Sequence, residues 1–214
     1  MTGDPATRGP APTGASRARK PHAKTALRRE AILQAAMAVF GSRGYHNGSL
    51  QEIADHAGMT HAGVLHHFGS KEQLLIALLE YRDEADVANL EGHHAPRGGE
   101  FLDHLVSTAK ENTARSGIVQ AYAVLAGEAV TEGHPAQEFF RTRLAGLRAM
   151  LVDALDEASE GVAAQENIER AAAAIIATMD GLQVQWLLDP EAVEMPQTVR
   201  MVIDALLERL KSST

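Results

Sequence analysis

Histidine is the residue of this sequence with the widest chemical scope, because its ring can bind a metal ion, transfer a proton or contact nucleic acid. Five of the ten histidines lie between His46 and His67. Two metal ligands on one helix face must stand three or four residues apart, and no two histidines have that spacing. His56, His61 and His66 recur at five-residue steps, which turn them to different sides of a helix. We therefore expect no metal site in this stretch.

Other motifs for catalysis or cofactor binding are also missing from the sequence. It contains no cysteine, which excludes thiolate catalysis, disulfides and Cys-ligated zinc. It has no G-x-S-x-G motif, no phosphate-binding loop and no dinucleotide fingerprint. We expect no catalytic residue, no metal and no cofactor. These absences disfavour an enzyme, although an enzyme or a helical adaptor that binds no DNA is kept as a remote alternative.

The stretch Ser49–Phe68, SLQEIADHAGMTHAGVLHHF, has the pattern of two short helices joined by a glycine turn. Ser49 and Glu52 form a capping box at the start of the first helix. Gly58 ends that helix, where a positive φ costs glycine little, and Thr60 caps the second helix. The second helix buries its apolar residues and exposes His61, Ala62, Gly63, His66 and His67. This arrangement is typical of a DNA-binding helix-turn-helix.

The start of the second helix suits contact with DNA. Ala62 and Gly63 are small enough to let the helix backbone approach base edges, and the free N–H groups of a helix N-terminus favour phosphate. A simple helical corner in a protein that binds no DNA has the same short pattern. The flanking segments must therefore separate the two interpretations.

Helices are expected on both sides of this stretch. Residues 25–44 have an apolar face typical of a helix, and Ser70 with Gln73 forms a second capping box before a connecting helix from Lys71 to about His94. The segment GYHNGSLQEIADHAGMTHAGVLHHFGSKEQLL resembles the signature of the tetracycline-repressor (TetR) family. The resemblance is close over residues 27–79, in motif order, helix spacing and the F-x-S-K-E-x-L junction.

The resemblance implies an all-α homodimer whose three N-terminal helices bind a palindromic DNA operator. It implies a larger C-terminal domain that binds a small-molecule effector and releases the repressor from DNA. The implied DNA contacts are Ser49, Thr60, His61, Ala62, Gly63, His66, His67 and Lys71. Leu65 stands where the family usually has a phosphate-contacting Tyr, so that contact is absent or replaced by His66. An activator or a corepressor-dependent member would carry the same motifs.

The distribution of charge agrees with an N-terminal part that binds DNA and a C-terminal domain that does not. The whole chain carries −8, but residues 1–71 hold nine Lys or Arg against four Asp or Glu, a net +5. We therefore predict a disordered basic arm at 1–24, a DNA-binding domain at 25–70 and a ligand-binding and dimerisation domain at 71–214. The arm could equally be a solvated tail without function. No segment of about 20 apolar residues is present, and we expect a cytoplasmic protein.

The C-terminal part reads as five further helices, at residues 100–116, 118–132, 135–159, 164–188 and 196–211. The last two are the most apolar, and in the family the corresponding helices pair with those of a second copy. An intramolecular core is the alternative. The predicted dimer contacts are Ile175, Leu182, Val199, Val202, Ile203, Leu206, Leu207 and Leu210.

Effector contacts are predicted where apolar or adaptable side chains combine with a few polar tips. The candidates are His104, Tyr122, Leu125, Phe140, Leu147, Met150, Met179, Gln183 and Trp186. Each of these is more often a core residue than a ligand contact. Asp180 is an acid in an apolar helix and needs a partner or a wet edge, so a structural role is favoured for it.

Overall fold

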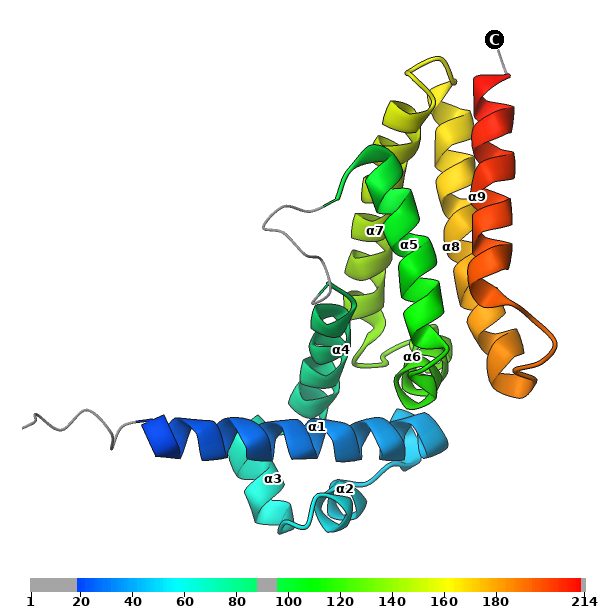
Figure 1. Cartoon of the computed structure of the whole chain (residues 1–214). Coiled ribbons are helices and arrows are strands. Elements are labelled where there is room, and N and C mark those ends of the chain that lie inside the picture. The colour runs from blue at the N-terminus through cyan, green and yellow to red at the C-terminus, as the bar shows by residue number, and fades with distance from the viewer. Residues whose placement is uncertain (1–18, 88–95, 213–214) are drawn as a thin grey trace, which may run out of the picture.

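The fold is all-α, as predicted. The computed structural model describes residues 19–87 and 96–212, and within these ranges it contains nine helices and no strand (Figure 1). The helices are α1 (Arg19–Asn47), α2 (Leu50–His56), α3 (His61–Phe68), α4 (Lys71–Val87), α5 (Gly98–Asn112), α6 (Ser116–Glu128), α7 (Gln137–Ala158), α8 (Gln165–Leu188) and α9 (Met195–Lys211). The five C-terminal helices begin and end within four residues of the predicted bounds.

Helix α1 is longer than predicted at both ends. It begins at Arg19, inside the segment expected to be a disordered arm, while residues 1–18 lie outside the described part of the chain. Near its end the backbone bends at Gly44, whose φ of 74° and ψ of 175° are essentially restricted to glycine. The connecting helix α4 ends at Val87, so the rest of its predicted extent, to about His94, falls on residues that the structure does not describe.

The caps of the short helices form largely as predicted. Ser49 Oγ accepts the backbone N–H of Glu52 at 3.1 Å, and Thr60 Oγ1 accepts that of Gly63 at 3.1 Å. The reciprocal half of each capping box is not seen. The Glu52 carboxylate pairs with Arg43 at 2.7 Å, since that guanidinium offers a charged partner, and the Ser70 N–H donates to the Phe68 carbonyl.

The molecule consists of a helix-turn-helix end, predicted to bind DNA, and an upright bundle. In Figure 1, α1 lies across the foot of the bundle with α2 and α3 beneath it, while α4 rises from α1 beside α7. Helix α6 crosses the foot and packs along α1. The first apolar core therefore combines residues of α1–α4 with Leu125 of α6 and Phe140 of α7. Three of the predicted effector contacts, Tyr122, Leu125 and Phe140, are thus part of the core that joins the two halves.

The second apolar core lies in the upright bundle of α5, α7, α8 and α9. Trp186, one of the predicted effector contacts, is 9% exposed and packs inside this core. From the sequence we expected no apolar segment long enough to cross a membrane, but helix α8 meets that condition by length and composition. Its buried residues pack against the rest of the bundle, as expected of the core helix of a helical protein.

Candidate DNA-binding surface and ligand pocket

The outer face of α3 presents small and polar side chains at the foot of the molecule. Val64 and Phe68 anchor the helix in the first core, which leaves His61, Ala62 and His66 exposed. Gly63 is partly covered, and a Cβ at this position would lie 3.2 Å from Thr60 Oγ1. The first turn of α3 is therefore narrow and accessible, as close approach to base edges requires.

A basic groove runs beside α3 and was missed by the sequence analysis. It encloses about 560 Å³ and is lined by Lys24, Thr25, Arg28, Arg29, His66 and His67. The pKa of His67 is lowered mainly by desolvation, and the charges of His66, Arg28 and Arg29 lower it further. The 24/28 spacing places two basic side chains on one face of α1. That spacing was the signal that sequence reasoning could have used.

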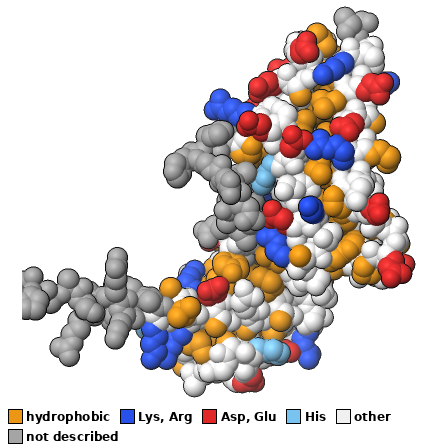
Figure 2. Space-filling view, viewed as in Figure 1, with side chains coloured by type: hydrophobic (Ala, Val, Ile, Leu, Met, Phe, Trp, Pro, Cys, Tyr) orange, Lys and Arg blue, Asp and Glu red, His pale blue; other side chains and the backbone are white. Residues whose placement is uncertain are grey.

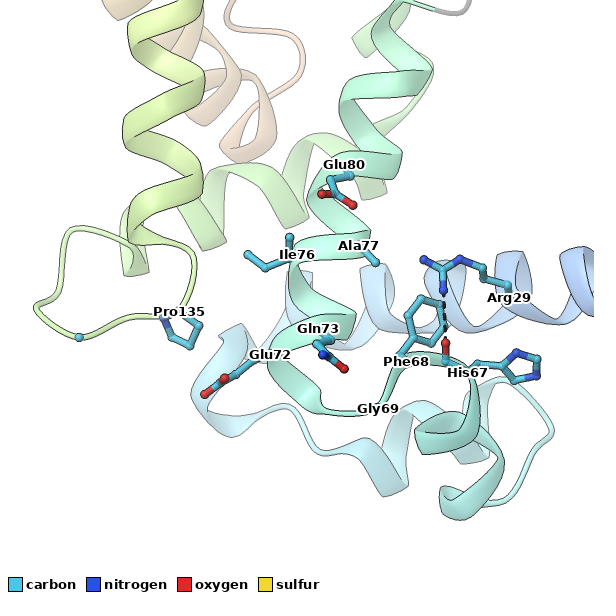
Figure 3. Close-up of a pocket in the computed structure, with 11 residues that line it drawn as sticks. Arg29, His67, Phe68, Gly69, Glu72, Gln73, Ile76, Ala77, Glu80 and Pro135 are labelled. Carbon is cyan, nitrogen blue, oxygen red and sulfur yellow. Dashed lines mark hydrogen bonds between the residues drawn. The ribbon is translucent and has the colours of Figure 1, made fainter.

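Arg29 holds the C-terminal end of α3 in place. Its guanidinium donates to the His67 carbonyl at 3.3 Å and lies 4.1 Å from the centre of the Phe68 ring. Figure 3 shows these contacts on one side of α4, in a second groove of about 770 Å³, while Ile76 of α4 points to the other side, where Pro135 lies. The orientation of α3 is thus held by α1 rather than by the turn alone.

Lys71 is turned toward the protein. Its ammonium donates to the His46 carbonyl at 3.3 Å and lies 4.5 Å from the centre of the Tyr45 ring. Desolvation lowers the pKa of Lys71, while the charge of Glu128 raises it. Lys71 therefore helps to hold α4 against the end of α1, and a phosphate contact by Lys71 remains a prediction.

A pocket of about 270 Å³ lies among α4, α5, α6, α7 and α8. Six of the nine predicted effector contacts line it, namely His104, Tyr122, Leu147, Met150, Met179 and Gln183. Leu125, Phe140 and Trp186 do not, because they pack into the two cores. The pocket combines mostly apolar walls with a few polar groups, as small-molecule sites do.

Three charged residues of the pocket form a connected network that the sequence did not reveal. Asp83 on α4 accepts from Arg143 Nε at 2.7 Å and from Arg82 at 3.1 Å. Arg143 also donates to the Tyr122 hydroxyl at 2.9 Å, and Arg82 lies 4.0 Å from the centre of the same ring. Burial raises the pKa of the Tyr122 hydroxyl, although both guanidiniums oppose this shift. Helix α4 is thereby tied to α6 and α7 at the pocket.

Asp180 lines the same pocket from α8. The residue keeps contact with solvent, yet the protein crowding around its carboxyl raises its pKa, against the opposing charges of Arg143 and Arg82. No group of three or more His, Asp or Glu able to hold a metal ion occurs among the described residues.

The outer face of α8 and α9 is apolar and uncovered by the chain itself. Val184, Leu188 and Met201 are 48%, 83% and 63% exposed, and the small residues of α8 beside them are exposed too. Five predicted dimer contacts lie instead inside the chain's own core, because they face α5 and α7: Ile175, Leu182, Val199, Ile203 and Leu210. Only Val202, Leu206 and Leu207 of that set keep exposed surface.

Two family profiles match this chain. Residues 32–78 match the profile described as "Bacterial regulatory proteins, tetR family". Residues 101–211 match "BetI-type transcriptional repressor, C-terminal". The two matched segments comprise the helix-turn-helix and the helices around the pocket.

Individual relatives cover nearly the whole chain. It is 28% identical over 203 residues to the probable transcriptional regulator ArpR of Pseudomonas putida, covering 86% of this chain and 92% of that protein. It is 28% identical over 200 residues to the regulator BetI of Rhizobium meliloti, covering 87% and 91%. A solved transcriptional regulator from Rhodococcus sp. superposes with a TM-score of 0.66 at 26% identity, covering 85% of this chain and 95% of that one. These similar proteins are named as regulators of transcription, not as enzymes.

Proposed function

Because this chain belongs to the TetR family of bacterial transcriptional regulators, we propose that it is a homodimeric repressor that a small-molecule effector releases from a palindromic operator. Repression is favoured because BetI-type repressors match the C-terminal part of the chain and BepR of Brucella suis, a relative, is named a repressor. A protein with this role acts where the DNA is, so we expect it in the cytoplasm.

The observation that carries the proposal is the exposed first turn of α3 beside a basic groove. His61 and Ala62 are accessible at the helix N-terminus, while Lys24 and Arg28 flank the other end of the same helix. Groups of these two kinds are needed together, because side chains on base edges read sequence and cations on phosphates supply affinity. Figure 2 shows His and basic side chains at this end beside a few acidic ones, while acidic and basic side chains both occur over the bundle.

Selection of binding sites from random duplex DNA tests the proposal directly. We expect two inverted half-sites, because two copies related by a two-fold axis present two α3 helices. We also expect affinity to fall steeply with salt, by roughly 0.9 counterion per phosphate contact. A single half-site consensus bound tightly would contradict a dimeric repressor.

His61→Ala tests whether α3 reads bases. It should relax preference at one base position in each half-site, at about 1–3 kcal/mol if His61 makes a good base contact. His56→Ala is the matched control, because His56 is exposed on α2 and its Nδ1 lies 2.8 Å from the Glu52 carbonyl. An unchanged consensus with His61→Ala would remove His61 from the reading surface.

Dimerisation is assigned to the uncovered face of α8 and α9. Met201→Arg should place a charge in that contact and shift sedimentation toward the monomer. Val130→Arg is the control, since Val130 is also an apolar residue, 82% exposed, but lies beyond the end of α6. An unchanged dimer with Met201→Arg would move the interface to another surface.

Effector release is assigned to the pocket that Asp83 and Tyr122 line. An effector that weakens DNA binding must itself bind less tightly to the DNA-bound protein, typically by about 1–3 kcal/mol. Met150→Ala, at the exposed rim of the pocket, should reduce the effector response and leave operator binding nearly unchanged. Full sensitivity in this variant would displace the proposed site.

A further inference from the structure

Apart from His104, which stands between Phe101 and Leu105, the polar and apolar linings of the pocket lie at opposite ends. On α5, apolar Phe101 and Leu105 come before polar Thr108 and Asn112. Helix α7 runs in the opposite direction to α5 in Figure 1, and along it Arg143 comes before the apolar lining residues. Both helices thus place their polar lining toward α6 and the DNA-binding end, and their apolar lining toward the far end of the bundle.

Two buried amides face the polar end without partners. Asn112 is 2% exposed and Gln183 is 6% exposed, and both line the pocket. No hydrogen bond to either amide side chain is found within residues 19–87 and 96–212. Thr108, which is 7% exposed, lies one turn before Asn112 on the same wall. Neither residue has an amide atom among the buried atoms that lack a partner, so these amides open onto the pocket, where a bound molecule that both donates and accepts can replace water.

The charged groups at the same end are matched to one another. Asp83 accepts from both Arg82 and Arg143, as described above. An anionic head group would have to compete with Asp83 for those guanidiniums and lose its own hydration. An ammonium attracted by Asp180 would share this pocket of about 270 Å³ with the guanidiniums of Arg82 and Arg143, which also line it. Neither ionic head finds an unopposed counter-charge.

We propose that the effector is an uncharged amphiphile, with an apolar body at the far end of the pocket and a carboxamide-like head hydrogen-bonded to Asn112 and Gln183. The inference rests on the proposed function only in calling this molecule an effector. A carboxamide supplies one acceptor oxygen and two donor hydrogens. These complement the amide oxygens and nitrogens of Asn112 and Gln183, while the apolar body replaces water against Phe101, Leu105 and Ile176.

Three compounds with one body and different heads test the proposal: 3-phenylpropanamide, 3-phenylpropanoate and 3-phenylpropylamine. Their affinities for the full chain are measured by calorimetry at pH 7 without DNA. We expect the amide to bind at least about ten times more tightly than the acid or the amine, because only the ions must be desolvated without a free counter-charge. Tighter binding of either ion, equal binding of all three, or no binding by the amide would overturn the proposal.

Two variants locate the head group. Gln183→Leu and Asn112→Leu each keep the side-chain size roughly constant and should weaken the amide about five-fold, as expected for one lost hydrogen bond. Binding of the two ions should not change. Gln120→Leu is the matched control, since Gln120 is exposed on α6. If both pocket variants bind the amide as the unmodified chain does, the head is not held by Asn112 and Gln183.

The same samples keep this inference separate from the proposed function. Thermal unfolding shows whether each variant is folded, and a Leu variant that fails to fold is replaced by Gln183→Glu, which should weaken the amide through its added charge. Operator binding is measured independently with labelled duplex DNA. Selective amide binding by a chain that binds no operator would count against the proposed repressor function alone.

Discussion

Two joints connect the DNA-binding end to the bundle, and they are built differently. At the joint between α1 and α6, Glu128 accepts the backbone N–H of Tyr45 at 2.6 Å, and apolar residues of both helices share one core. At the joint between α4 and α7, Asp83 meets Arg143 at 2.7 Å on the wall of a pocket. The first joint contains a hydrogen bond between a backbone N–H and a side chain within a packed core. The second contains an ion pair between two side chains beside a cavity.

This difference separates the tasks of the two joints. Close packing resists small displacements, so the α1–α6 joint can transmit a movement of α6 to the turn that precedes α2. An ion pair beside a cavity can rearrange when the cavity is filled, so the α4–α7 joint is the one that an effector would change. Tyr122 belongs to both, because its ring packs in the first core and its hydroxyl accepts from Arg143.

Gly44→Ala should lower the free energy of unfolding most, because it disturbs both the backbone and a side-chain contact of the packed joint. The backbone of Gly44 has φ 74° and ψ 175°, and an added Cβ would overlap the Glu128 carboxylate. Strain in this region costs about 1–3 kcal/mol, and moving the carboxylate away from Tyr45 adds to it. We expect the free energy of unfolding to fall by about 3 kcal/mol or more, measured in urea.

Gly58→Ala is the matched control for that measurement. Gly58 has a similar φ of 62°, but nothing lies within 4 Å of the position of its Cβ. It should cost only the backbone term, about 1 kcal/mol. Equal losses in the two variants would show that the Glu128 contact contributes little, and the contrast between the joints would fail.

Asp83→Ala should cost less, because the second joint is partly solvated. It removes the carboxylate shared by Arg82 and Arg143, and the side chain of Asp83 is 35% exposed. Allowing for solvent screening, we expect a loss of about 1–2 kcal/mol in urea unfolding. Glu166→Ala is the control, since the Glu166–Arg170 pair is mostly exposed and its loss should change stability little. A larger loss than with Gly44→Ala would reverse the ranking of the joints.

The sequence predicted the features that depend on near neighbours. The side-chain caps of Ser49 and Thr60 and the positive φ of Gly58 each involve residues within three or four positions. A hydrophobic period also located the helices of the bundle, because it reports burial of one face. It could not distinguish burial against the same chain from burial against a second copy, so Ile203 was assigned to an interface although it lies in the core.

The charged parts of both joints escaped prediction for a different reason. Asp83 and Arg143 are 60 residues apart in sequence, and Tyr45 and Glu128 are 83 apart. No local period relates such positions, because their meeting depends on how the helices pack. The same limit explains why the lining of the pocket was predicted only in part. The exposed residues of α3 were easier to predict from the sequence, because they belong to a motif with fixed spacing.

Acid should weaken the packed joint through His134. Its side chain is 0% exposed, its Nδ1 accepts the Ala136 N–H, and its Nε2 lies 3.8 Å from Glu128. Desolvation lowers the pKa of His134 below 6.5; the charge of Glu128 opposes this, and that of His46 adds to it. The unfolded chain therefore binds the proton first. Stability from this group is present above about pH 6.5 and declines as pH falls from there toward the folded pKa.

Urea unfolding at several pH values measures the contribution of His134. One proton taken up on unfolding changes the free energy by at most about 1.4 kcal/mol per pH unit. His134→Gln should flatten the decline between pH 6.5 and 5.5, whereas His56→Gln, at an exposed position of α2, should leave it unchanged. A decline of the same slope in His134→Gln would assign the acid sensitivity to other groups.

Tyr122→Phe should have the smallest effect and separates the two joints within one residue. The ring stays in the first core and under the Arg82 guanidinium, 4.0 Å away, so the α1–α6 joint keeps its packing. Only the hydrogen bond from Arg143, 2.9 Å long, is lost, which costs about 0.5–1.5 kcal/mol. Tyr81→Phe is the control, because the Tyr81 hydroxyl accepts a longer bond of 3.3 Å from the exposed Gln34.

The hydrogen bond lost in Tyr122→Phe ties α6 to α7 at the pocket. This variant should therefore alter effector-induced release more than DNA affinity without effector, both measured by fluorescence anisotropy of a labelled operator. If DNA affinity without effector changed more than the release, the hydroxyl would act through the packed joint, and the division of tasks between the joints would have to be redrawn.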